Sequence, residues 1–211
     1  MPLLLQNFLI NDTRLAVWDI KETEAFFLEQ VPVNNAITHP HKRLQHLAGR
    51  YLLQYMFAAF PYHLIEIAST RKPFLPGDAF HFSISHCSNF AAAIAGADAR
   101  VGIDVEVITP RVHKIKHKFL SAAELAFVNG YSAGQHNILL TLLWSAKEAM
   151  YKWYGLGEVD FIENMLTLPF HFAQSGTIPC MFTNSTLAEH LTLQYQILQG
   201  IILVWVASPA Q

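Results

Sequence analysis

The chain has 211 residues, of which 52% are hydrophobic and 14% are charged, and its formal net charge is −2. This length and composition are typical of a compact globular chain with a substantial core and exclude an intrinsically disordered one. The small net charge provides no global attraction to nucleic acid, so an acidic partner would need a local basic patch. The two cysteines, Cys87 and Cys180, form neither a metal-binding spacing nor a disulfide framework, which fits a reducing compartment.

The apolar segments are too short to direct the chain to a membrane. Residues 1–7 lack a basic region, and their apolar run is shorter than that of a signal peptide. The segments 90–97 and 201–207 fall far below the roughly 20 apolar residues of a membrane span. We therefore expect a soluble, cytoplasmic and monomeric protein that binds neither membranes nor nucleic acid.

The N-terminal third predicts a strand, a loop and a long helix. Residues 14–20 read as a strand, and prolines and asparagines between 32 and 40 mark a loop. From about 41 to 60, apolar residues recur at three- and four-residue spacing, which is typical of an amphipathic helix. The polar face of this helix carries several basic residues, Arg43 and Arg50 among them. For any single one of them, a solvated position is the alternative interpretation.

The middle of the chain predicts a turn-rich loop at 71–78, a hairpin across 80–94 and a further strand at 101–108. In that strand the period of two puts Asp104 and Glu106 on one face, where two like charges repel each other. A solvated edge would explain them. A divalent cation would explain them better, because Mg²⁺ prefers carboxylate oxygens.

Residues 144–152 predict a helix that contains good helix formers and neither glycine nor proline. Glu148 and Lys152 lie one turn apart on it, and Lys147 lies beside them. An acid between two lysines can hold a metal-bound phosphate, and Glu148 would complete a three-carboxylate site with the two strand carboxylates. The alternative is an exposed Glu148–Lys152 pair that stabilises the helix by a few tenths of a kcal/mol.

Two further patterns lie on either side of this helix. Ser121 and Glu124 form a capping box, so we interpret Glu124 as a helix cap rather than a catalytic residue. The segments 191–198 and 201–207 read as strands that complete a sheet.

Two motifs together resemble a known enzyme family. Gly102-Ile103-Asp104-Val105-Glu106 and Trp144-Ser145-Ala146-Lys147-Glu148-Ala149-Met150-Tyr151-Lys152 are similar to the paired signature of the 4′-phosphopantetheinyl transferases. The separation of 44 positions between Asp104 and Glu148 is similar to the spacing in the larger, single-chain subclass that activates peptide and polyketide synthases. Weaker similarities to family segments occur at 72–76, 82–87, 119–124 and 155–157.

The resemblance implies an α+β fold of two similar half-domains related by a pseudo-twofold. Each half would be a small, mostly antiparallel sheet packed with a long helix. Residues 1–100 would form the half that contacts coenzyme A, and 101–211 the half with the metal site and the catalytic helix. A faint similarity between 47–53 and 144–150 agrees with a duplication, and we expect one active site in the cleft between the halves.

The activity implied is transfer of 4′-phosphopantetheine from coenzyme A to a serine of an apo acyl or peptidyl carrier protein, with release of 3′,5′-ADP. This is the holo-[acyl-carrier-protein] synthase type of reaction, used in fatty acid and polyketide biosynthesis. Mg²⁺ or Mn²⁺ would bind Asp104, Glu106 and Glu148. The catalytic residues would be Glu148, Lys152 and Lys147, with Glu148 or a metal-polarised water as the base.

Coenzyme A contacts are also implied by the resemblance. Gln45 stands where the family often has an arginine, so Arg43 or Arg50 would replace it at the 3′-phosphate. Cys87 stands where the family usually has a serine. The expected coenzyme A contacts are Lys72, Ser85, His86, Arg43, Arg50 and Lys152.

The densest positive segment of the chain is 111–118, which contains no acid. We expect it to dock the acidic carrier protein through Arg111, Lys114, Lys116 and Lys118. A solvated basic loop, or a contact to the 3′-phosphate, is the alternative. Two rival functions remain open at this point: a metal-dependent phosphohydrolase acting on a nucleotide pyrophosphate, and a non-catalytic module that binds coenzyme A or a carrier.

Overall fold

The computed structural model describes residues 2–31, 37–77 and 79–210. The loop residues Pro32, Asn34 and Asn35 lie outside the described residues. Among those described, no helix combines the length and apolar character needed to cross a membrane.

The first sheet is antiparallel and is built from the N-terminal part of the chain. Its strand order is β1 (Leu3–Phe8), β2 (Arg14–Asp19), β6 (Phe90–Gly96), β5 (His81–Cys87). Helix α2 (Pro40–Met56) packs on one face of this sheet, and α1 (Glu24–Leu28) lies beside α2. Pro40 occupies the first turn of α2, where its missing N–H costs no hydrogen bond.

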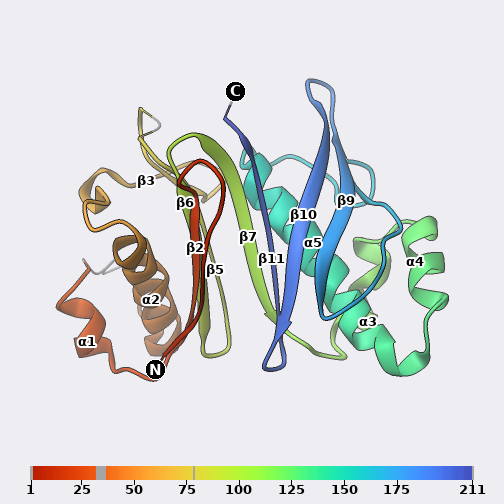
Figure 1. Cartoon of the computed structure of the whole chain (residues 1–211), viewed down its shortest axis with the longest axis horizontal. Helices are drawn as coiled ribbons and strands as arrows, with labels where there is room; N and C mark the ends of the chain where they lie inside the picture. The colour runs from red at the N-terminus through yellow and green to blue at the C-terminus, as the bar shows by residue number, and fades with distance from the viewer. Residues whose placement is uncertain (1, 32–36, 78, 211) are drawn as a thin grey trace.

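The second sheet is also antiparallel and comes from the C-terminal part of the chain. Its strand order is β7 (Ala99–Val107), β11 (Ile201–Pro209), β10 (Ala188–Leu198), β9 (Ser175–Thr183), β8 (Met165–Thr167). Helix α5 (His136–Tyr154) packs on one face of it, as α2 does on the first sheet (Figure 1). Gly155, in the left-handed conformation at φ 77°, ends α5.

The two sheets contact each other through the faces that their helices leave free. In β2, Leu15 and Val17 point to this shared core while Ala16 and Trp18 point to α2, as the period of two in a strand requires. Strand β5 lies beside β7, where the Ile103 N–H donates to Ser83 Oγ at 3.2 Å. The molecule is therefore a stack of helix, sheet, sheet and helix.

The same order of elements occurs in both halves. A strand, a long helix and a hairpin follow one another as β2, α2, β5, β6 and again as β7, α5, β10, β11. In both, the last strand of the hairpin pairs antiparallel with the first strand. The expected α+β class with antiparallel sheets and long helices is confirmed, and the repeated order is what a duplicated unit predicts.

Short elements connect these layers. The small hairpin of β3 (Glu66–Ile67) and β4 (Pro73–Phe74) precedes β5. Between β7 and α5 lie α3 (Val112–Ile115), a 3-10 turn, η2 (Lys116–Lys118), and α4 (Ala122–Asn129). Helix α4 begins with the predicted capping box, in which Ser121 and Glu124 each bond the other's backbone N–H.

Candidate active site

Helix α5 rests directly on β7 because Gly102 has no side chain. A Cβ at this position would clash with the Ala149 carbonyl oxygen and would lie 2.7 Å from the Trp153 nitrogen. The strand period then brings Asp104 and Glu106, on the same face of β7 as Gly102, against the helix. The glycine of the first motif thus positions the two acids of that motif.

Asp104 is the centre of a hydrogen-bond network that joins three elements. Its Oδ1 accepts from Lys152 Nζ at 2.7 Å and from Ser85 Oγ at 2.8 Å. Its Oδ2 accepts from Ser145 Oγ at 2.8 Å. Asp104 is 3% exposed, so these bonds replace the water that the carboxylate loses on burial.

Two further carboxylates share this electrostatic environment. Burial, followed by the charge of Asp104, raises the pKa of Glu106 to about 7 and that of Glu148 to about 6. The Trp144 indole and the Lys152 ammonium act against this shift at Glu106. Three acids that repel one another around one lysine form a site suited to additional positive charge.

Basic side chains come to the same place from α2 and β5. Burial, then Arg50 and His86, lower the pKa of His46 to about 4, so this imidazole is neutral near pH 7. Its buried Nε2 has no hydrogen-bond partner among the residues described. The pKa of His86 is also lowered, by burial and then by the charge of Lys152. The site therefore has an acidic side and a basic side.

The two arginines expected near coenzyme A differ in their surroundings. The Arg43 guanidinium donates to both carboxylate oxygens of Glu24, at 2.7 and 2.8 Å. Arg50 has no such ion pair among the described residues, and burial lowers its pKa. Of the two, Arg50 is the one close enough to affect His46.

A cavity of about 230 Å³ adjoins the acids. The β3–β4 turn, β5 and α5 enclose it, and its lining includes Lys72, Glu148 and Lys152. The Lys72 ammonium donates to the backbone oxygen of Lys152 at 2.6 Å, and a Cβ at position 155 would clash with that ammonium. The glycine that ends α5 thus makes room for Lys72.

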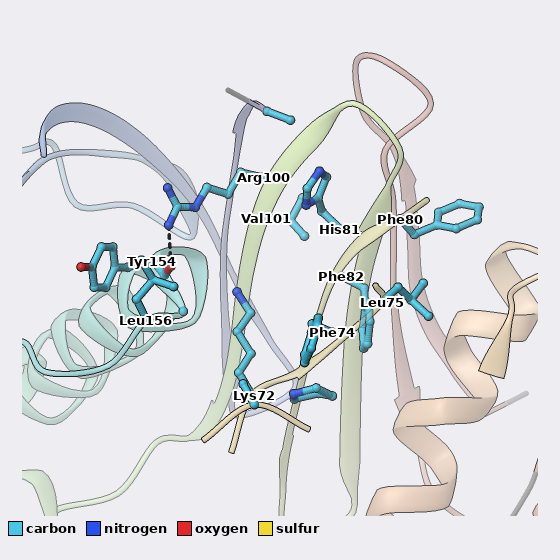
Figure 2. Close-up of a pocket in the computed structure, with 14 residues that line it drawn as sticks. Lys72, Phe74, Leu75, Phe80, His81, Phe82, Arg100, Val101, Tyr154 and Leu156 are labelled. Carbon is cyan, nitrogen blue, oxygen red and sulfur yellow. Dashed lines mark hydrogen bonds between the residues drawn. The ribbon is translucent and has the colours of Figure 1, made fainter. Parts of the chain in front are cut away.

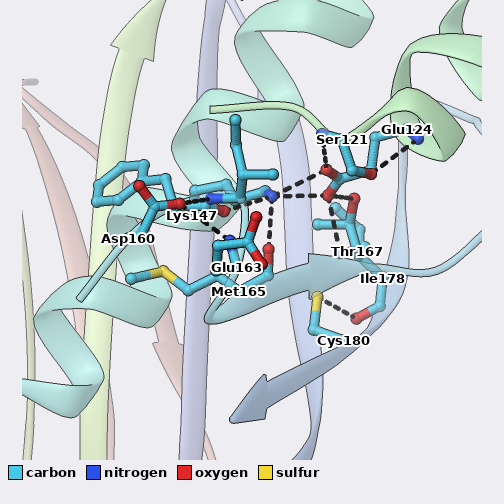
Figure 3. A network of polar contacts seen from close by, with 11 residues as sticks. Ser121, Glu124, Lys147, Asp160, Glu163, Met165, Thr167, Ile178 and Cys180 are labelled. Atoms are coloured by element: carbon cyan, nitrogen blue, oxygen red, sulfur yellow. Dashed lines mark hydrogen bonds and ion pairs between the residues drawn. The ribbon is translucent and has the colours of Figure 1, made fainter. Parts of the chain in front are cut away.

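Lys147 does not lie at this site, which corrects the expectation that it is catalytic. It is fully buried, and its Nζ lies 2.8 Å from Glu124 Oε1. It also donates to the backbone oxygens of Phe161 and Met165, so all three ammonium protons have partners (Figure 3). Thr167 completes the network by donating to Glu124 Oε1. This is a structural ion pair beneath the second sheet.

The basic segment expected to dock a carrier forms α3 and η2. Arg111, Lys114 and Lys118 are exposed, and Lys116 is half-buried. Within the segment His113 Nε2 bonds Asn137 Oδ1 at 2.8 Å, which ties α3 to the start of α5. The segment thus presents its lysines to solvent from a surface attached to the helix that carries Glu148.

Two residues at the site have effects that the sequence did not indicate. Ser145 donates to the second oxygen of Asp104, and the Trp144 indole acts to lower the pKa of Glu106. A signal for Ser145 was available, since it precedes Glu148 by three residues and so lies on the same helix face. Cys87 lies close enough to Glu106 and Asp104 that they help burial raise its pKa to about 12, so its thiol stays protonated.

No three histidine, cysteine, aspartate or glutamate side chains of the described residues are grouped so as to hold a metal ion. Both oxygens of Asp104 already accept hydrogen bonds, one of them from a lysine that supplies positive charge.

The family comparison matches the half of the chain that contains α5. The model of the 4′-phosphopantetheinyl transferase superfamily matches residues 100–202. Enterobactin synthase component D of Salmonella austin is 31% identical over 111 residues, which cover 53% of this chain and 47% of that protein. The 4′-phosphopantetheinyl transferase AcpT of Escherichia coli (strain K12) is 28% identical over 116 residues, 54% of this chain and 59% of that protein.

A third relative is the 4′-phosphopantetheinyl transferase psf-1 of Bacillus pumilus, 38% identical over 78 residues, which cover 37% of this chain and 33% of that protein. The chain thus spans less than two thirds of the length of each of these three relatives.

Proposed function

Since the chain belongs to the 4′-phosphopantetheinyl transferase superfamily, we propose that it transfers 4′-phosphopantetheine from coenzyme A to a serine of an apo carrier protein. The observation that carries this proposal is the buried Asp104 beside Lys152, with Glu106 and Glu148 in the same electrostatic environment and a cavity alongside. We place the reaction in the holo-[acyl-carrier-protein] synthase type, with carriers of fatty acid or polyketide synthesis as acceptors.

In the proposed reaction the serine oxygen attacks the β-phosphorus of the coenzyme pyrophosphate. The new O–P bond forms as the P–O bond to 3′,5′-ADP breaks, and the serine proton needs an acceptor. Glu148 suits that role, because a carboxylate with a pKa of about 6 is ionised at neutral pH yet basic enough to take a proton. Lys152 supplies a fixed cation near the charge that develops on the phosphates.

The proposal includes Mg²⁺, or Mn²⁺, on Asp104, Glu106 and Glu148. The donor set fits in its chemistry, since Mg²⁺ prefers carboxylate oxygens. Burial, followed by the charge of Asp104, raises the pKa of Glu106 and of Glu148, and a cation would offset that charge. When bound, the ion would offset the negative charge of the pyrophosphate. Lys152, which donates to Asp104 Oδ1 at 2.7 Å, would place its ammonium beside that ion and near the phosphates.

For the coenzyme, we propose that Arg50 rather than Arg43 serves the 3′-phosphate. Arg43 is already paired with Glu24, whereas Arg50 has no carboxylate partner among the described residues. His86 and His46 lie on the same basic side, and the unpartnered Nε2 of His46 could donate to a phosphate oxygen. Lys72 and Ser85 complete the proposed contacts. The exposed lysines of 111–118 would meet the acidic carrier.

The test is a mass measurement on an apo acyl carrier protein incubated with the full chain, coenzyme A and Mg²⁺. We expect a gain of one phosphopantetheine group, lost when EDTA replaces Mg²⁺. Asp104→Asn, close in size to the aspartate, should reduce the rate by roughly a thousandfold or more. A second arm omits the carrier: release of nucleotide there would support the phosphohydrolase instead. Neither transfer nor hydrolysis, with coenzyme A still bound, would support the binding module.

A further inference from the structure

A second cavity, of about 500 Å³, also has Lys72 in its wall (Figure 2). The β3–β4 hairpin, the first residues of β5 and β7, and the end of α5 enclose it. Glu148 and Lys152 line the smaller cavity and do not line this one. The proposed chemistry therefore gives the larger cavity no occupant.

The walls of this cavity are largely apolar and extend to the surface. Phe74, Leu75, Phe82 and Leu156 are among the lining residues. Leu156 is 68% exposed and Phe74 is 37% exposed. Large apolar side chains that line one opening and are exposed to this degree often mark a binding site. The opening thus favours a ligand with an apolar body.

Two cations line the cavity. They are Lys72 and Arg100, and none of the described lining residues is acidic. No carboxylate among the described residues forms an ion pair with Lys72, whose ammonium bonds only to the Lys152 backbone oxygen at 2.6 Å. Burial, followed by the charge of Arg100, lowers the pKa of Lys72 to about 8. A bound anion would offset both the burial and the charge of Arg100, because it favours the charged form of Lys72.

Arg100 is held in place at the edge of the cavity. Its Nε donates to the Trp153 oxygen at 2.9 Å and its Nη2 to the Tyr154 oxygen, and the guanidinium lies 4.3 Å from the centre of the Trp153 ring. The charge of Glu189 acts on it from outside the lining. Such a fixed guanidinium is preorganised for a carboxylate or a phosphate, because little side-chain freedom remains to be lost.

We propose that this cavity is a second ligand site, which takes a small amphipathic anion with its charged head at Lys72 and Arg100 and its apolar body against Phe74 and Leu156. The head is a carboxylate or a phosphate monoester, and a volume of about 500 Å³ suits a body of small-molecule size. Since Lys72 lines both cavities, an occupant here also acts on one wall of the smaller cavity. The proposal does not depend on the transfer reaction.

The experiment is isothermal titration of the full chain with octanoate, octyl phosphate, octanol and inorganic phosphate. We expect octanoate or octyl phosphate to bind at one site per chain, and the two arms identify the preferred head. Octanol, which lacks the charge, and phosphate, which lacks the chain, should bind at least about tenfold more weakly. No saturable binding of either octyl anion, or equal binding of octanol, overturns the proposal.

A matched pair of variants locates the site. Leu156→Glu places a negative charge at the opening on an exposed side chain and should weaken octanoate binding about tenfold. Ile10→Glu makes the same kind of change at a position that is 77% exposed and outside the cavity lining, and should leave binding unchanged. Thermal unfolding confirms that both variants are folded. Equal affinities in the two variants contradict the location.

Competition with coenzyme A completes the test. Octanoate should still bind when coenzyme A is saturating, although more weakly, because the two occupy different cavities that share Lys72 in their walls. Complete mutual exclusion would assign the larger cavity to the coenzyme and overturn a separate site. The octanoate titrations without coenzyme A contain no carrier and need no turnover, so a failure of the proposed transferase function leaves their result intact.

Discussion

Lys147 and Lys152 lie five residues apart on α5 but have different surroundings. The Lys147 side chain is 0% exposed, forms an ion pair with Glu124, and donates its other hydrogen bonds to backbone oxygens. The Lys152 side chain is 24% exposed, pairs with Asp104 and Ser85, and lines a cavity. Both pairs have nearly the same length, 2.8 and 2.7 Å.

The difference follows from helix geometry. Side chains five residues apart on an α-helix point in directions that differ by about 140° around the axis. Lys147 therefore points toward Glu124 in the interior of the C-terminal half, whereas Lys152 points toward β5 and the cavity. An ion pair whose every proton has a protein partner can only hold the fold together. A pair at a cavity wall can exchange its partner for a ligand. The chemical type of the residue is the same, and its helix face determines its role.

The largest effect on stability is expected at Lys147. Lys147→Met leaves the Glu124 carboxylate buried without its cation, which should lower the free energy of unfolding by about 3–5 kcal/mol. Urea unfolding measures this. Adding Glu124→Gln removes the orphaned charge while keeping an acceptor for the capping bonds, so the double variant should recover part of the loss. A Lys147→Met protein as stable as the wild type would contradict the structural role.

The helices and strands near the motifs could be predicted from sequence, because each carried a strong local signal. The capping box at Ser121 is present, and β7 is a strand with Asp104 and Glu106 on one face. Helix α2 ends at Met56 rather than near 60, since Phe57 adopts an extended backbone. Strands β1, β8 and β9 were not individually predicted; their pairing with distant segments, rather than local pattern, defines them.

The candidate site could be predicted only in part. The strand period predicted that Asp104 and Glu106 share a face of β7, and the helix period predicted that Glu148 and Lys152 lie one turn apart on α5. The sequence could not reveal that Lys147 is buried, since its partner Glu124 lies 23 residues away on another helix. It also could not reveal that Lys152 bonds Asp104, because from sequence we expected a divalent cation to offset the repulsion between the carboxylates.

A smaller effect, dependent on pH, is expected at His46 on the basic side of the Lys152 site. Its pKa is about 4 in the folded chain against 6.5 as the ordinary value, so the unfolded chain binds the proton more readily. Its contribution to stability is complete above about pH 6.5 and is lost as the pH falls toward 4. Unfolding free energies at pH 7.5 and 5 should differ less in His46→Gln than in wild type, on the order of 1 kcal/mol.

The exposed His63 gives the control for this comparison. His63→Gln should leave the pH dependence of unfolding as it is in the wild type. If both variants change the pH dependence of the unfolding free energy equally, that dependence does not arise from the burial of His46 next to Arg50 and His86.

The smallest effect is expected at the docking segment, because exposed charges are screened by salt. Reversing Lys114 and Lys116 to Glu should raise the apparent KM for the carrier several-fold at low ionic strength and leave that for coenzyme A nearly unchanged. Reversing the exposed Lys21 and Lys42, which lie on the first half, is the control. A carrier KM equal to that of the wild type at low salt excludes docking by this segment.

The central claim is that Lys152 serves the chemistry while Lys147 serves the fold. The most direct test is the single-turnover rate of phosphopantetheine transfer to an apo carrier, measured at equal concentrations of folded protein. Lys152→Gln should be roughly 100-fold slower than the wild type or more, as for loss of one fixed donor at developing charge. Lys147→Met, once corrected for its folded fraction, should stay within a few-fold. Equal losses in the two variants, or a larger loss for Lys147→Met, would contradict the account.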